Sequence, residues 1–127
     1  MEAIAIVAIL ALAQFVLFSI QVGSMRAKHD VRAPAITGHP DFERMFRIQQ
    51  NTMEQLVVFI PVLWIFGYLV NPFWGAAIGL VFIIGRFMYR ASYLKDPAAR
   101  GMGFTITFVP TAVMLVWSLI VALRGFF

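Results

Sequence analysis

Hydrophobic positions fall in four long stretches, separated by short polar or proline-containing connections. The stretches cover residues 3–22, 42–70, 73–93 and 104–123. A hydrocarbon core about 30 Å thick takes roughly 20 helical residues to cross, so each stretch is long enough to span a membrane. The pattern predicts an all-α, integral membrane four-helix bundle. A chain of 127 residues leaves no room for a second domain, so we expect one domain, residues 1–127.

The composition points to the same class of protein. Hydrophobic residues make up 61% of the chain and charged residues 13%, which is too apolar for a soluble domain that covers itself with polar groups. The first stretch follows Glu2 rather than a basic residue and lacks a clear cleavage site, which favours a helix of the mature protein over a secretion signal. Cysteine is absent, so any thiol used in a reaction must come from a substrate.

Positive charge gathers at two of the three connections. The basic residues beside the first and third connections are Arg26, Lys28, Arg32, Arg44, Arg47, Arg86, Arg90, Lys95 and Arg100. With four passes these connections share one side, which the positive-inside tendency makes the cytosolic side. For Arg26, Lys28, Arg32 and Lys95 a role in topology is favoured over a ligand role. The minimal loops favour a bacterial inner membrane, with any site at this end facing the cytoplasm.

Proline and cap residues predict how the helices are joined. Residues 23–40 are predicted to form a structured surface loop, with Asp41 as the cap of the second helix. The Asn-Pro pair at 71–72 predicts a tight turn, which makes the second and third helices antiparallel neighbours. The Asp-Pro pair at 96–97 predicts a cap and a new helical turn that holds Arg100.

Small residues predict close helix packing. Gly75 and Gly79 stand four residues apart on the third helix, a spacing that lets transmembrane helices approach closely. Packing within the chain is the default interpretation. Association into a homo-oligomer is also compatible with small-faced helices and embedded polar groups, but composition does not fix the number of subunits.

A polar stripe on the second helix is the strongest indication of a site. Arg47, Asn51 and Glu54 are spaced i, i+4, i+7, so they lie on one face of a helix. Ionisable residues in a spanning segment are costly and normally face the bundle interior or a wet cavity. Three polar groups exceed what one structural pair needs, which favours a functional role.

The third helix carries a second polar group at the same end. Arg86, Arg90 and Tyr93 share a face, and Tyr89 flanks it. Taken alone, the tyrosines are typical of an interfacial aromatic belt. A structural pair between Arg86 and Glu54 is as well supported by the spacing as a functional role. Arg100 is expected at the mouth of the resulting pocket.

Several classes of chemistry lack their motifs. His29 and His39 are ten residues apart with no acidic partner at ligand spacing, so we interpret them as surface residues and expect no metal site. Protease, nucleotide hydrolase and dinucleotide-binding patterns are absent. Nucleic acid is not expected as a partner, because the basic residues lie against a membrane.

One run of residues resembles a known signature. Residues 40–54, PDFERMFRIQQNTME, match the pattern FER followed by RxQxNxxE of the MAPEG family, the membrane-associated proteins in eicosanoid and glutathione metabolism. The resemblance covers the whole chain, including Tyr89, Tyr93 and the following Arg100. It is greatest to the leukotriene C4 synthase and microsomal glutathione S-transferase branch.

The resemblance implies a specific enzyme. It implies a homotrimer with glutathione as co-substrate, held between subunits near the cytosolic surface, and Arg100 as the catalytic residue that activates the thiol. By matching positions, the implied glutathione-binding residues are Arg26, Arg47, Gln49, Asn51, Glu54, Tyr89 and Tyr93. The implied partner is a lipophilic electrophile, for conjugation in detoxification, or a lipid hydroperoxide, for reduction.

Two other functions compete with this one. The first is a non-enzymatic lipid-binding scaffold, because the resembling family includes such a protein. Within the enzyme interpretation, the leukotriene-forming branch has two adjacent arginines where this chain has Arg26 followed by Ala27. That departure weakens an assignment of leukotriene synthesis. A transporter would also need embedded charges, but the half of the chain around residues 66–82 and 117–123 is almost wholly apolar, which suits a pocket open at one end.

Overall fold

Four long helices and one short 3₁₀ turn account for almost all of the chain. The computed structural model covers residues 1–127. The elements are α1 (Glu2–His29), α2 (Pro40–Leu69), α3 (Pro72–Lys95), the 3₁₀ turn η1 (Pro97–Arg100) and α4 (Gly101–Phe126). Four spans, with η1 and α4 forming one of them, are long and apolar enough to cross a membrane. The prediction of an all-α four-helix membrane bundle is confirmed.

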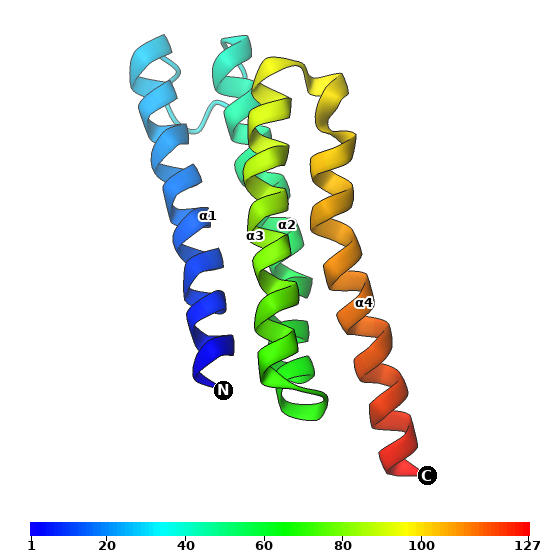
Figure 1. Cartoon of the computed structure of the whole chain (residues 1–127). Coiled ribbons are helices and arrows are strands. Elements are labelled where there is room, and N and C mark those ends of the chain that lie inside the picture. The colour runs from blue at the N-terminus through cyan, green and yellow to red at the C-terminus, as the bar shows by residue number, and fades with distance from the viewer.

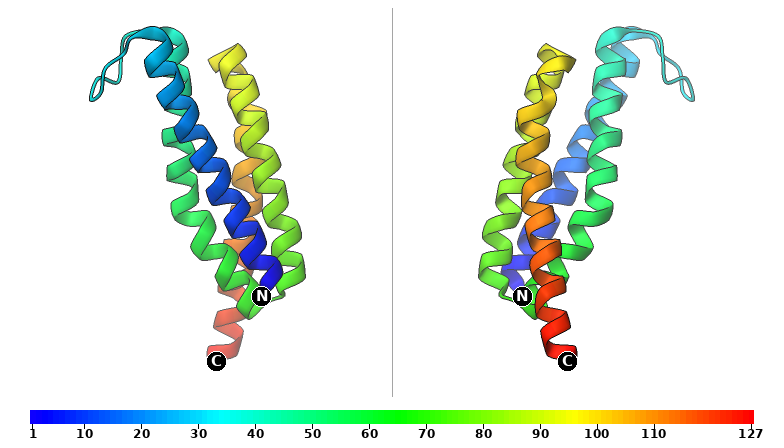
Figure 2. Two further views of the ribbon diagram at one scale, coloured as in Figure 1. Left: turned by 90° about the vertical axis from the view of Figure 1, so that its left-hand side faces the viewer. Right: turned by 90° about the vertical axis from the view of Figure 1, so that its right-hand side faces the viewer.

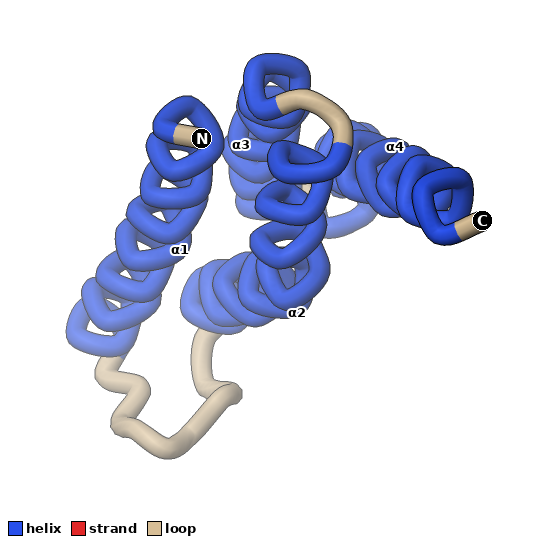
Figure 3. Tube along the Cα trace, turned by 90° about the horizontal axis from the view of Figure 1, so that it is seen from below, coloured by secondary structure: helices blue, strands red, loops and turns tan.

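The helices form an antiparallel bundle with two distinct ends. The α1–α2 loop and the α3–η1–α4 connection lie at one end, and both termini and the α2–α3 turn lie at the other (Figure 1). Seen along the bundle, α2 and α3 lie between α1 and α4 (Figure 3). The two basic connections therefore share one end, as the sequence predicts.

The first connection is shorter than predicted. The helix α1 continues to His29 instead of ending near Val22, and Asp30 ends it in a left-handed conformation with φ 52°. Residues 25–28 are Met, Arg, Ala and Lys, which are good helix formers, and basic side chains in the last turn complement the helix dipole. The loop is thus limited to residues 30–39, and it projects sideways from the bundle (Figure 2).

The cap of α2 also differs from the prediction. His39, and not Asp41, is the N-cap residue, and its Nδ1 accepts a hydrogen bond from the Asp41 backbone N–H at 3.1 Å. Pro40 then occupies the first helical position, which suits its fixed φ angle and missing N–H. Asp41 lies in the first turn with its carboxylate free for other contacts.

The predicted turn at Asn71-Pro72 and the predicted cap at Asp96 are confirmed, and Asn71 is itself the cap of α3. The Asn71 side-chain oxygen accepts from the Trp74 N–H at 3.0 Å and starts α3 directly after α2. The Asp96 carboxylate accepts from the Ala98 N–H at 3.1 Å and starts η1. The second of these caps fixes the backbone turn that carries Arg100.

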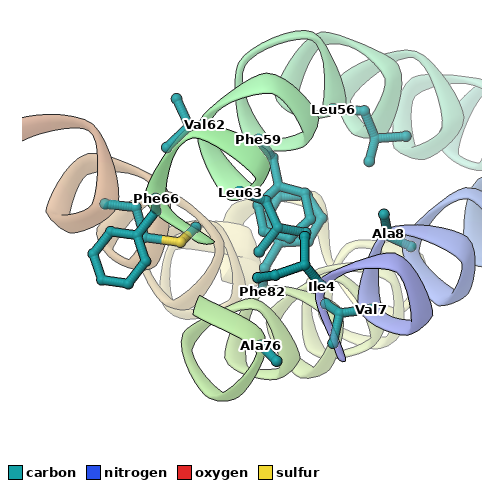
Figure 4. Close-up of a cluster of buried hydrophobic side chains, with 12 residues drawn as sticks. Ile4, Val7, Ala8, Leu56, Phe59, Val62, Leu63, Phe66, Ala76 and Phe82 are labelled. Carbon is teal, nitrogen blue, oxygen red and sulfur yellow. The ribbon is translucent and has the colours of Figure 1, made fainter. Parts of the chain in front are cut away.

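An apolar core fills the end of the bundle that holds the termini. Side chains of α1, α2 and α3 meet there, and the Phe59 and Phe82 rings stack with centroids 3.8 Å apart (Figure 4). Large hydrophobic side chains such as Trp64, Trp74 and Trp117 are exposed on the outer surface, as expected where lipid replaces water as the solvent. The apolar half predicted from the sequence is therefore well packed inside and lipophilic outside.

Glycines allow close helix contacts at two levels. A methyl group at Gly75 would lie 2.8 Å from Ile4 Cδ1, and one at Gly79 would lie 2.7 Å from Val7 Cγ1, so the predicted close approach is confirmed against α1. Gly85 and Gly103, which the sequence analysis did not single out, mark a tighter crossing. There α3 and α4 touch backbone to backbone, because a methyl group at Gly103 would lie 2.5 Å from Tyr89 Cα.

Replacing Gly103 with alanine is expected to destabilise the protein by about 1–3 kcal/mol, because the added methyl forces α3 and α4 apart and neither backbone can yield locally. The matched control is Gly125→Ala, where nothing lies within 4 Å of the new methyl. Thermal unfolding in detergent should show a clear loss of stability for the first variant and none for the second. Equal melting temperatures for Gly103→Ala and the parent would contradict the tight crossing.

Candidate active site

A polar cavity lies at the basic end of the bundle. Its volume is about 320 Å³, and its lining comes from α2, α3 and η1: Arg47, Gln50, Asn51, Glu54, Tyr89, Tyr93 and Arg100. Six of these seven residues are predicted site residues. The structure thus brings together the polar stripe of α2, the tyrosines of α3 and the arginine of η1, and the expected position of Arg100 beside the pocket is confirmed.

The side of the cavity formed by α2 keeps its charges unpaired. Arg47 and Glu54 are exposed, and neither forms a salt bridge within the chain. Gln50 also lines the cavity and was missed by the sequence analysis. Its spacing of three residues from Arg47 and four from Glu54 places it on the same helix face, which is the signal that would have identified it.

Arg86 supports the cavity from within the bundle. It is fully buried, and its Nη2 donates to Asn51 Oδ1 and to Thr52 Oγ1, both at 2.9 Å. Because the Asn51 oxygen is occupied in this way, the Asn51 NH₂ group is left to donate toward the cavity.

The structural ion pair between Arg86 and Glu54, which the sequence left open, does not form. Arg86 reaches α2 at the level of Asn51 and Thr52, and its guanidinium lies 4.3 Å from the Tyr89 ring centroid. A cation over an aromatic face is attracted by the ring quadrupole, so Arg86 holds Tyr89 as well as Asn51 in place. Glu54 consequently keeps a free carboxylate at the cavity.

The opposite side of the cavity consists of two tyrosines and Arg100. Tyr89 is buried and Tyr93 is partly exposed, with ring centroids 5.6 Å apart. Arg100 is exposed, and its Nη1 donates to the Pro97 carbonyl oxygen at 2.6 Å. That bond fixes the guanidinium to η1 and leaves its other N–H groups available to an anion in the cavity.

Two predicted binding residues lie outside the cavity. Arg26 stacks over the Phe42 ring at 4.7 Å and donates to the Ala35 carbonyl oxygen in the first loop at 2.7 Å. Gln49 donates to Ser19 Oγ of α1 at 3.3 Å. A single chain therefore does not bring Arg26 and Gln49 to the cavity, and their predicted role requires a neighbouring subunit.

The two histidines, interpreted from the sequence as surface residues without an acidic partner, are half-buried and lie together beside Asp41. The His29 and His39 rings are stacked with centroids 3.7 Å apart, and His29 Nε2 lies 3.9 Å from Asp41 Oδ2. The extension of α1 to His29 and the return of the loop to His39 bring them together. Sequence spacing could not show this, because residue 29 falls in a segment predicted to be a loop.

Comparison with known proteins identifies the family. Residues 4–120 match the model of the MAPEG family. Uncharacterized protein sll1147 of Synechocystis is 37% identical over 116 residues, which cover 91% of this chain and 85% of that protein. Human microsomal glutathione S-transferase 2 is 41% identical over 104 residues, which cover 82% of this chain and 71% of that protein. Bovine leukotriene C4 synthase is 36% identical over 83 residues, which cover 65% of this chain and 55% of that protein. The chain is an integral membrane protein that belongs to the MAPEG family.

Proposed function

We propose that the protein is a membrane-bound glutathione S-transferase that activates the glutathione thiolate for attack on lipophilic electrophiles. The observation that carries the proposal is a polar cavity in a MAPEG protein, in which Arg47 and Glu54 are unpaired and Arg100 lies beside them. Relatives with matching sequences are named as microsomal glutathione S-transferase 2 and leukotriene C4 synthase.

The cavity lining complements the groups of glutathione. This tripeptide carries two carboxylates, one ammonium group, two amide bonds and a thiol. Guanidinium groups bind carboxylates through paired, charge-assisted hydrogen bonds, so Arg47 is assigned to a glutathione carboxylate. Glu54 is assigned to the ammonium group. Asn51, held by Arg86, is assigned to an amide carbonyl of the peptide, to which it can donate.

Activation of the thiol is assigned to Arg100. A free thiol has a pKa of about 8.5 and is only a few per cent thiolate at neutral pH. A guanidinium close to the sulfur lowers that pKa, and a shift of about two units would make roughly three quarters of the bound thiol the nucleophilic thiolate. Because Arg100 belongs to η1 and retains free N–H groups, it is suited to this role.

The electrophile is expected to arrive from the lipid. The outer face of α4 carries an open apolar hollow, lined by Ala112, Val113, Val116, Trp117 and Ile120, which begins twelve residues along the chain from Arg100. A lipophilic molecule dissolved in the bilayer reaches such a surface without crossing water. In conjugation the thiolate forms a carbon–sulfur bond and displaces a leaving group as its anion, such as chloride from chlorodinitrobenzene, or adds to an activated double bond that then takes up a proton. With a lipid hydroperoxide, two glutathione molecules instead give the disulfide, an alcohol and water.

The proposed active assembly is a homotrimer in a bacterial inner membrane, with the cavity facing the cytoplasm. Arg47 and Glu54 are exposed in the single chain although they lie in a spanning helix, and contact with lipid would be costly for both. A neighbouring subunit over the cavity removes that cost and supplies Arg26 and Gln49 from the surface they occupy. Native mass spectrometry should show three chains per particle, whereas a monomer that binds glutathione would contradict the shared site.

Purified protein in detergent is expected to conjugate glutathione to chlorodinitrobenzene, with the product followed by its absorbance. The rate of the Arg100→Ala variant is compared with that of the parent protein, because this variant lacks the proposed activating group and keeps the other lining residues. Glutathione binding without turnover in the parent protein would favour the lipid-binding scaffold instead. An absence of both glutathione binding and turnover would contradict the transferase.

A further inference from the structure

We propose that His29, His39 and Asp41 form a binding site for a divalent transition-metal ion, at the junction of α1 and α2. One ligand atom from each residue lies within 4.8 Å of the other two. The site is separate from the polar cavity, since none of these residues lines it. The inference therefore does not depend on the proposed glutathione chemistry.

The donor set has the chemistry of a metal centre. Two imidazoles and one carboxylate suit zinc and its neighbours in the first transition row, and three protein ligands leave a further position for water. Magnesium and calcium, which prefer oxygen ligands, are disfavoured. The chain has no cysteine, so histidine and carboxylate are its strongest available zinc ligands.

A buried nitrogen without a partner indicates where an ion would be held. His29 Nε2 is inaccessible to solvent and forms no hydrogen bond, and the side chain as a whole is 14% exposed. A buried polar atom that lacks a hydrogen bond is unusual and costly. Asp41 Oδ2 is 3.9 Å away, and this gap is too long for a hydrogen bond. An ion between the two atoms would satisfy both.

Ligation requires the three side chains to move closer together. Zinc holds nitrogen and oxygen ligands at about 2.0–2.2 Å, so the ligand atoms must close to roughly 3.3 Å from one another. The stacked rings lie nearly parallel, with an interplanar angle of 13°, and they must rotate so that their lone pairs converge. If His39 binds through Nδ1, the metal replaces the capping bond from the Asp41 N–H.

The position of the site gives it a structural consequence. His29 is the last residue of α1 and His39 is the cap of α2, so a bound ion closes the loop of residues 30–39 at its base. The same loop supplies the Val31 and Ala35 carbonyl oxygens that hold Arg26. Metal occupancy is therefore expected to order the surroundings of Arg26.

The direct test is metal binding by the full chain, purified in detergent without a histidine tag and without glutathione, which itself binds zinc. Titration calorimetry with Zn²⁺ should give one ion per chain. Co²⁺ should develop the visible absorption of a four- or five-coordinate site, and Zn²⁺ should displace it. Binding weaker than millimolar, or a six-coordinate cobalt spectrum at saturation, would overturn the proposal.

Three variants remove one ligand each and retain its structural role. His29→Phe keeps a ring that can stack, His39→Asn keeps a helix cap, and Asp41→Asn keeps the side-chain shape. Each should weaken zinc binding by roughly tenfold or more, with unchanged helical content by circular dichroism. The control Lys28→Gln, on the last turn of α1, should bind as the parent does. Parent-like affinity in all three ligand variants would refute the site, whether or not conjugation activity is present.

Discussion

Replacing Arg100 with alanine is expected to lower kcat for conjugation about 25-fold at neutral pH. The thiolate fraction of bound glutathione should fall from roughly three quarters to about 3% when a two-unit lowering of the thiol pKa is lost. Without the guanidinium, the pKa of the bound thiol returns toward its value in water, and most of the bound glutathione stays protonated. The KM for glutathione should change much less, since Arg47, Asn51 and Glu54 still line the cavity.

The pH dependence separates this role from a general loss of structure. A thiol with a raised pKa becomes thiolate as the pH increases, so the activity of Arg100→Ala should recover between roughly pH 7 and pH 9, while that of the parent protein should change little. Arg100→Lys keeps a cation and should retain part of the activity. A variant whose activity is low at every pH and whose KM has risen in proportion would assign Arg100 to binding instead.

Replacing Arg47 with alanine is expected to weaken glutathione binding by about 2–3 kcal/mol, which corresponds to roughly 30- to 150-fold in Kd. Arg47 is exposed and has no acidic partner in the chain, so its guanidinium is free to pair with a carboxylate of the ligand. Removing it leaves that carboxylate without a counter-charge in a partly desolvated cavity. Titration calorimetry with glutathione measures the loss.

The control for Arg47 is Lys95→Ala, which removes one positive charge from the same end of the bundle without altering the cavity lining. Its Kd should stay within about threefold of the parent value, since exposed charges are screened by salt. Equal losses in both variants would mean that net charge, and not a specific contact, attracts glutathione. An unchanged Kd in Arg47→Ala would remove Arg47 from the site.

The fold and most of the cavity could be predicted from the sequence for clear physical reasons. Spans of apolar residues have the length that a bilayer imposes, and the spacing of Arg47, Asn51 and Glu54 fixes them on one helix face whatever surrounds them. Caps such as Asp96 act on residues close in sequence, so local chemistry determines them. These features need no knowledge of which helices touch.

Features that depend on contacts between distant residues could not be predicted. The partner of Arg86 depends on which residues of α2 lie beside it where α3 packs against α2. The tight crossing at Gly103 depends on how α4 is positioned along α3. The pairing of His29 with His39 depends on where α1 ends. The roles of Arg26 and Gln49 depend on a second chain, so they stay predictions.

The most direct test of the account is a structure of the purified protein in lipid with glutathione bound. It should show the tripeptide in the cavity, with a carboxylate on Arg47, the ammonium group on Glu54 and the sulfur beside Arg100. An empty cavity, with Arg47, Asn51 and Glu54 bonded only to one another at saturating glutathione, would contradict it.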